Sequence, residues 1–180
     1  LNYNAGIMFE KPGVIGPASK FFANVKTVFE HPDAYDHFSI KGGVGLSYEL
    51  DKKQTVSAEV SLDYSRIHDA FGEHRYLIAS VPLQYVYDNR DNRLNPTRGF
   101  RVLAYAEPSY DLLSGATFLK LRGEGSAYQS LDSASKFVFA ERVAIGSIVA
   151  GPLALWLPVA VLLCVPLLAA AALAIPIIAV

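Results

Sequence analysis

The sequence predicts an all-β protein, namely an antiparallel transmembrane β-barrel fragment of about seven or eight meander strands followed by a hydrophobic tail. Two observations predict this fold. Apolar and polar residues alternate with a spacing of two residues, which places them on opposite faces of a strand. The alternating segments also match the 9 to 11 residues that cross a bilayer, whereas soluble strands are typically about 5 or 6 residues long.

The alternation is clearest in two neighbouring segments. From Phe38 to Leu50 the even positions are apolar or glycine, and the odd positions are serine, lysine, glycine or glutamate. From Thr55 to Arg66 the even positions up to Tyr64 are apolar again, and the polar sequence Asp51–Gln54 between the segments predicts a tight turn. Each predicted strand therefore has one apolar and one polar face.

Other segments show the same alternation less regularly. A further segment at Tyr3–Phe9 would raise the number to eight strands, which is enough to close a small barrel. Gly42, Gly43 and Gly45 suggest close strand packing or a bend. The less regular segments are Phe21–Glu30, Arg75–Asp88, Phe100–Tyr110, Thr117–Gln129 and Phe137–Ile148.

The links between predicted strands must fall alternately on two sides of the membrane, because consecutive strands run in opposite directions. We expect the sheet to be curved and partly open, with at least one unpaired edge. One side would hold the links Asp51–Gln54, Asp88–Gly99 and Leu131–Lys136, and the other side would hold His31–His37, His68–His74 and Leu112–Gly115.

Composition narrows the classes of protein to consider. A chain of 180 residues, 52% of them hydrophobic, is large enough for one domain. The formal net charge of -1 gives no electrostatic case for a nucleic-acid partner, and the single cysteine, Cys164, excludes an internal disulfide framework. The N-terminus at Leu1 lacks the features of a signal peptide, so we expect the chain to begin inside a larger protein.

The polar segment between two predicted strands, DNRDNRLNPTRGF, is the most specific motif. Pro96 cannot donate a ladder hydrogen bond and Gly99 tolerates positive φ, so the segment ends one strand and starts another. This motif and the later Glu141–Ser147 resemble the middle of the barrel domain in the BamA/TamA superfamily of outer-membrane assembly barrels, the bacterial surface antigen barrel domain, and more closely its TamA branch. The matching motif residues are Asp88, Arg90, Asp91, Asn95, Pro96, Thr97, Gly99 and Phe100.

The resemblance covers about residues 1–149, which we expect to form a partial outer-membrane barrel domain. It implies a protein of the bacterial cell outer membrane that helps insert or secrete other outer-membrane proteins, such as autotransporters. It implies no catalytic residue, no cofactor and no metal. The implied partners are outer-membrane lipid, client outer-membrane proteins and a periplasm-spanning partner of the TamB type. In that family a client strand pairs with an opened barrel seam.

The tail from 150 to 180 departs from the family, which would continue into a glycine-rich external loop with a Val-Arg-Gly-aromatic motif. No charged residue follows Arg142, and the run from Leu153 is long enough for a transmembrane helix. Pro158, Pro166 and Pro176 would kink such a helix. A membrane helix, a misread end of the coding region and a recombined join are the three explanations. We favour a non-native end, because helical spans belong to inner membranes.

Lys120, Arg122 and Glu124 share one strand face, which predicts a charged wall inside a barrel rather than a separate site. Glu141 and Arg142 are adjacent and should point to opposite faces. The histidine-containing links at 31–37 and 68–74 have no closed zinc spacing, so ordinary solvated loops explain them better than metal ligands. No serine lies in a G-x-S-x-G context. A small passive pore or structural barrel is the main alternative, and a barrel enzyme is the third.

Overall fold

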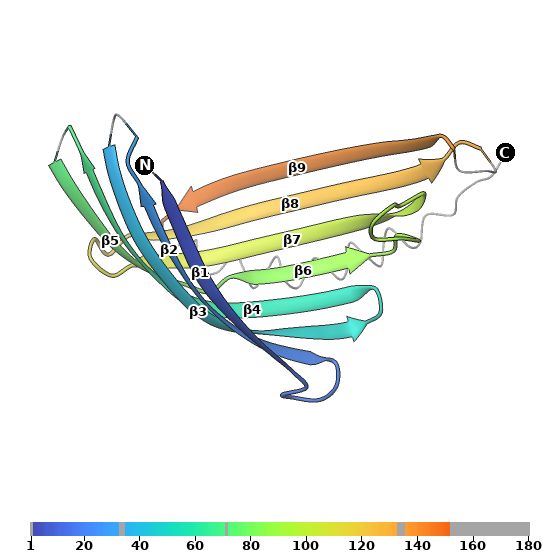
Figure 1. Ribbon diagram of the computed structural model, residues 1–180, viewed down its shortest axis with the longest axis horizontal. Coiled ribbons are helices and arrows are strands. Elements are labelled where there is room, and N and C mark those ends of the chain that lie inside the picture. Colours follow the sequence, from blue (N-terminus) through green and yellow to red (C-terminus); the bar gives the residue numbers. More distant parts are fainter. Residues whose placement is uncertain (1, 33–34, 71, 133–135, 152–180) are drawn as a thin grey trace.

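A computed structural model of the chain describes residues 2–32, 35–70, 72–132 and 136–151, and these residues form a curved sheet of nine β-strands (Figure 1). Every predicted segment lies in the sheet, but the segment predicted at Arg75–Asp88 forms two strands, so the structure has nine strands rather than the seven or eight expected. The strands are β1 (Tyr3–Pro12), β2 (Ser19–Glu30), β3 (Tyr35–Asp51), β4 (Gln54–Asp69), β5 (Gly72–Ser80), β6 (Leu83–Asp88), β7 (Arg98–Asp111), β8 (Thr117–Ser130) and β9 (Val138–Ala150).

Neighbouring strands in the sequence pair antiparallel, so the all-β meander that the sequence predicts is confirmed. β5 and β6 both lie between β4 and β7 and are two parts of one strand path. The path is interrupted at Val81 and Pro82, where proline has no N–H for the ladder. The Val81 amide donates to the carbonyl of Pro108 and the Pro82 carbonyl accepts from Glu59, so the strands stay in register.

The sheet is open within the described residues, because its strand order begins at β1 and ends at β9 and no ladder joins these two edges. This confirms the expected open sheet with an unpaired edge. In Figure 1, β6, β7, β8 and β9 lie side by side, and the ends of β3 and β5 rise away from them as the sheet curves.

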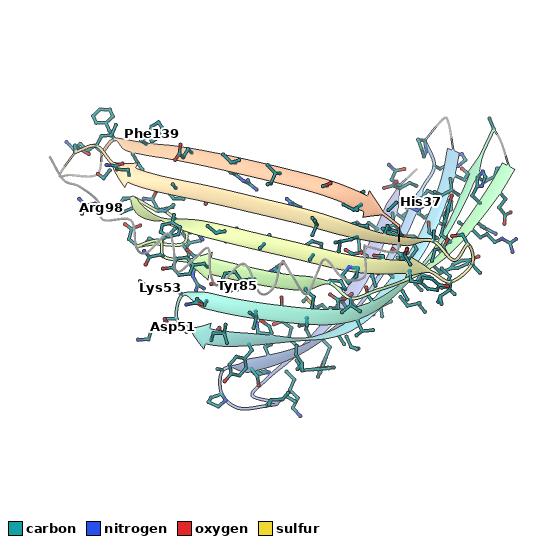
Figure 2. All side chains as sticks on the ribbon, turned by 180° about the vertical axis from the view of Figure 1, so that it is seen from behind. His37, Asp51, Lys53, Tyr85, Arg98 and Phe139 are labelled. Atoms are coloured by element: carbon teal, nitrogen blue, oxygen red, sulfur yellow. The ribbon has the colours of Figure 1, made fainter. Side chains whose placement is uncertain are left out.

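Successive links alternate between two ends of the sheet, as the strand pattern predicts. The carboxyl ends of β3, β6 and β8 lie at one end of the sheet, and those of β4 and β7 lie at the opposite end (Figure 1). Figure 2 shows Asp51, Lys53, Arg98 and Phe139 towards the first end and His37 far from them. The turn that carries the motif therefore lies at the same end as the short turn after β3.

The distribution of buried residues is the reverse of that in a soluble sheet. On β4 the side chains of Val60 and Leu62 are exposed, whereas Ser61 between them is buried. On β7 Val102 is exposed and Glu107, on the opposite face, is buried. A single curved sheet covers its own side chains only on the concave side, so the polar face is the inner face and the apolar face is the outer one.

Glycines in β3 allow large side chains to lie across the inner face. A Cβ at Gly43 would overlap the Glu59 carboxylate, and a Cβ at Gly45 would overlap the Phe22 ring. Glu59 crosses β3 above Gly43 and accepts a hydrogen bond of 3.1 Å from the Asn24 side chain on β2. Of the three glycines at which the sequence suggests close packing or a bend, Gly43 and Gly45 are therefore closely packed, whereas a Cβ at Gly42 would meet no atom nearer than 3.9 Å.

The predicted tail falls almost wholly on residues 152–180, which lie outside the described residues. Across the described part of the chain, the structure contains no helix with the length and hydropathy that a membrane crossing requires.

Candidate functional site

The turn between β6 and β7 is organised by the carboxylate of Asp91. Its Oδ1 accepts hydrogen bonds from the amides of Asn92, Thr97 and Arg98 at 2.9, 3.0 and 3.2 Å. Its Oδ2 accepts the Thr97 hydroxyl at 2.6 Å. The Thr97 hydroxyl, with the Arg98 and Thr97 amides, holds the pKa of Asp91 well below its ordinary value. One ionised carboxylate therefore connects the middle of the turn to its C-terminal part.

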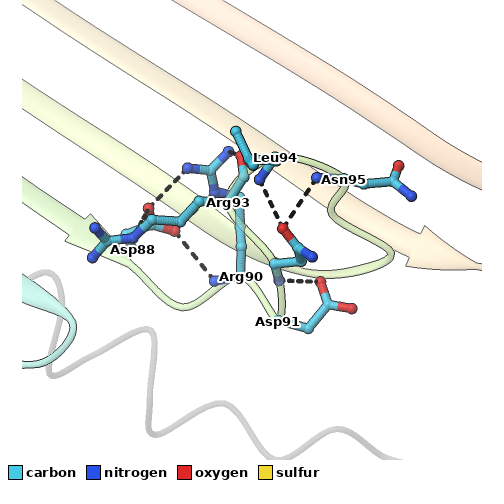
Figure 3. A network of polar contacts seen from close by, with 7 residues as sticks. Asp88, Arg90, Asp91, Arg93, Leu94 and Asn95 are labelled. Carbon is cyan, nitrogen blue, oxygen red and sulfur yellow. Dashed lines mark hydrogen bonds and ion pairs between the residues drawn. The ribbon is translucent and has the colours of Figure 1, made fainter.

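A second carboxylate, Asp88, ties the start of the turn to two arginines (Figure 3). Arg90 donates two parallel hydrogen bonds to Asp88, from Nε and from Nη2, each of 2.8 Å. Arg93 Nε lies 3.7 Å from the same carboxylate. The Asp88 and Arg90 side chains are 11% and 15% exposed, so this planar two-bond pair is partly shielded from solvent.

Gly99 and Phe100 close the turn against β6. Gly99 has a φ of 98°, and a Cβ there would lie 2.9 Å from Arg90 Cα and closer still to the Asn89 carbonyl oxygen. The Asn89 amide donates to the Phe100 carbonyl at 2.9 Å. The Phe100 ring stacks on Tyr87 with 5.3 Å between ring centroids. Only glycine fits at this position because backbone conformation and space both exclude a side chain.

The side chain of Asn92 organises the middle of the turn. Asn95 contributes its amide, which donates to the side-chain oxygen of Asn92 at 3.2 Å, and the Leu94 amide donates to the same oxygen at 2.8 Å. Asn92 is therefore a turn-organising residue that the motif leaves unassigned. An asparagine two residues before a chain reversal is a common signal for this arrangement. Pro96 lies in the turn between the two carboxylate-anchored segments.

The charged residues of β8 lie on the inner face, in contact with neighbouring strands. Lys120 Nζ lies 3.0 Å from Glu107 Oε1 on β7, and the Tyr105 hydroxyl donates to the same carboxylate. Arg122 and Arg142 both contact Glu124, the latter at 3.1 Å.

Glu107 and Tyr105 were not singled out from the sequence, although their odd-numbered positions on β7 alternate with apolar residues and would have indicated the polar face. Arg142 faces this network, and its neighbour Glu141 pairs in register with Ala127 on the apolar face. The opposite orientation of these two residues is as the sequence predicts.

The histidine-containing links at the far end of the sheet form local pairs. His31 Nδ1 contacts Asp36, and His37 lies 3.7 Å from Glu30 and 3.1 Å from the Ser65 hydroxyl. Within the described ranges, no three His, Cys, Asp or Glu side chains converge closely enough to hold a metal ion. His31 and His37 therefore have local acidic or hydroxyl partners and do not share a common site.

Comparison with known proteins gives one family and one fold. A family model described as the Omp85 superfamily domain matches residues 1–160. A crystal structure of BamA from Haemophilus ducreyi, lacking POTRA domains 1–3, is similar with a TM-score of 0.73 and 11% sequence identity. The match covers 84% of this chain and 34% of that one, so the chain spans about a third of the solved protein. A search of curated proteins found no match.

Proposed function

The chain belongs to the Omp85 superfamily, and from that premise we propose that it forms part of an outer-membrane barrel that assembles or translocates other outer-membrane proteins. The superfamily match supports the assembly or translocation role, and the reversed burial of the sheet supports its position in a membrane. Exposed valine, leucine and isoleucine side chains cover the outer face, and buried serine and glutamate side chains line the inner face. A lipid-facing exterior and a polar lumen require this distribution.

The finer function rests on the motif. We propose a TamA-like branch, because the turn Asp88–Phe100 and the segment Glu141–Ser147 resemble that branch more closely than the BamA branch. The clients would include autotransporters, and the partners would be outer-membrane lipid and a periplasm-spanning protein of the TamB type. The turn and the inner-face ion pairs have structural roles in this proposal, and no residue has a catalytic one.

Depletion of the protein in its own bacterium tests this proposal. We expect surface-exposed autotransporters to fall within a few generations, while abundant porins keep their folded, heat-modifiable form on gels. The measurements are surface protease accessibility of an autotransporter and the folded fraction of porins. A parallel fall of all outer-membrane barrels would support assembly but replace the TamA-like branch with a BamA-like one.

A different result would refute protein handling altogether. If depletion left every client unchanged and lowered only the uptake of small solutes, the chain would belong to a passive pore. Complementation with the wild-type gene is the control, because it separates the loss of this protein from general envelope stress.

A further inference from the structure

We propose that a cavity beside the turn binds a carboxylate ligand that no described residue supplies. The cavity has a volume of about 220 Å³ and lies at the turn end of the inner face. Three arginines and one glutamate line it. Its lining residues, called the arginine cavity below, are Arg90, Arg101, Glu124, Gly125, Ser126, Tyr128 and Arg142.

Positive charge exceeds negative charge in and around the arginine cavity. Glu124 is shared by Arg122 and Arg142, and Asp88 by Arg90 and Arg93. Each carboxylate therefore already serves two arginines. A concave site with an excess of arginines raises the local concentration of anions.

Among the arginines of the cavity, Arg101 is the one that has no carboxylate partner among the described residues. It lies on β7 opposite Asp88 of β6 and Ser126 of β8, and is partly buried. Among the described residues, no ion pair involves its guanidinium, whereas every other arginine of the cavity contacts a carboxylate. The hydroxyl groups of Ser126 and Tyr128 line the same space and add donors.

A carboxylate fits this donor set better than other anions. The nearest example is Asp88, which Arg90 holds through two parallel bonds of 2.8 Å each. A planar guanidinium group can donate two parallel hydrogen bonds to one carboxylate. This interaction is stronger when the guanidinium is shielded from solvent. The ligand is either an acidic side chain or terminus of a polypeptide, or a free small carboxylate.

This inference concerns only the ligand chemistry of one cavity and is independent of the proposed function. The test uses the full chain refolded in detergent micelles and titrated calorimetrically with four probes. These are an acetylated, amidated hexapeptide containing three glutamates, the same peptide with glutamines, glutarate, and inorganic phosphate. We expect the glutamate peptide or glutarate to bind more tightly than phosphate, and the glutamine peptide not to bind.

Substitutions locate the binding. Arg101→Gln should weaken binding at least tenfold. Arg101→Lys should weaken it less, because lysine keeps the positive charge but loses the paired hydrogen bonds of the guanidinium. Arg66→Gln, which removes an exposed arginine on β4 outside the cavity, should leave the affinity unchanged. Circular dichroism verifies that each variant keeps its β-structure, and Arg142→Gln provides a second cavity variant if Arg101→Gln does not fold.

The relative affinities separate the ligand sources. Tighter binding of the peptide than of glutarate identifies a polypeptide ligand, and equal binding identifies a free carboxylate. Tighter binding of phosphate, absence of binding by both carboxylate probes, or an equal loss in Arg101→Gln and Arg66→Gln would overturn the proposal.

Discussion

Replacement of Gly99 by alanine should destabilise the sheet by about 3 to 4 kcal/mol. An L-residue at positive φ costs about 1 to 2 kcal/mol, and the Gly99 φ is 98°. The new Cβ would also collide with the backbone of Asn89 and Arg90, so the two chain segments must separate. That movement breaks the Asn89–Phe100 and Asp91–Arg98 backbone hydrogen bonds, each with a net contribution of about 1 kcal/mol.

Gly115→Ala is the matched control for this prediction. Gly115 also has positive φ, of 74°, but the nearest atom to its Cβ would be the Tyr110 hydroxyl at 3.9 Å. Gly115→Ala should therefore lower the free energy of unfolding only through its unfavourable φ, by about 1 to 2 kcal/mol. Urea unfolding in detergent micelles, followed by circular dichroism, measures both losses. Equal losses for the two variants would refute the steric part of the reasoning.

Three further predictions concern the charges and the two faces. The low pKa of Asp91 stabilises the fold fully above about pH 4, where the unfolded carboxyl is ionised, and this stabilisation declines as the pH falls towards the folded pKa. The difference in urea midpoint between wild type and Asp91→Asn should therefore be constant from pH 7 to 5 and shrink below pH 4; a constant difference down to pH 3 would contradict this. Lys120→Met should cost about 1 to 2 kcal/mol, because Glu107 is 7% exposed but Lys120 is 41% exposed, and adding Glu107→Gln should recover most of the loss in the same urea assay. Val143→Arg on the outer face should cost about 2 to 4 kcal/mol in lipid vesicles, and Ala144→Arg on the inner face should fold normally, as judged by heat-modifiable migration.

The strands could be predicted because their outer faces are apolar and their inner faces are polar, so the residues alternate along each strand. The alternation located each strand but did not give its full length. In β3, for example, the strand begins at Tyr35, whereas the alternation begins only at Phe38. Backbone pairing continues past the apolar residues because ladder hydrogen bonds do not depend on side-chain type. The sequence contains a proline at the break between β5 and β6. It does not show that both strands pair with the same neighbour, β4, on either side of that break.

Side-chain contacts between neighbouring strands were harder to predict from the sequence than the strands themselves. Lys120 was assigned to a charged face, but its partner Glu107 depends on the register of β7 against β8, which is a property of two segments together. The contact of Glu59 with Asn24 also requires Gly43 to leave room on the strand between them. The turn was more predictable, because Asp91 bonds to residues within seven positions of itself.

The forces that hold this sheet together differ from those in a soluble domain. Only Tyr87, Ala106 and Leu119 are buried hydrophobic residues in the described part of the chain, so apolar burial within the protein contributes little. Backbone ladders and inner-face ion pairs fix the register, and lipid must cover the outer face. Hydrocarbon does not tolerate unpaired backbone groups, each of which costs several kcal/mol. The edges β1 and β9 of the described sheet therefore need partner strands once the sheet is in a membrane.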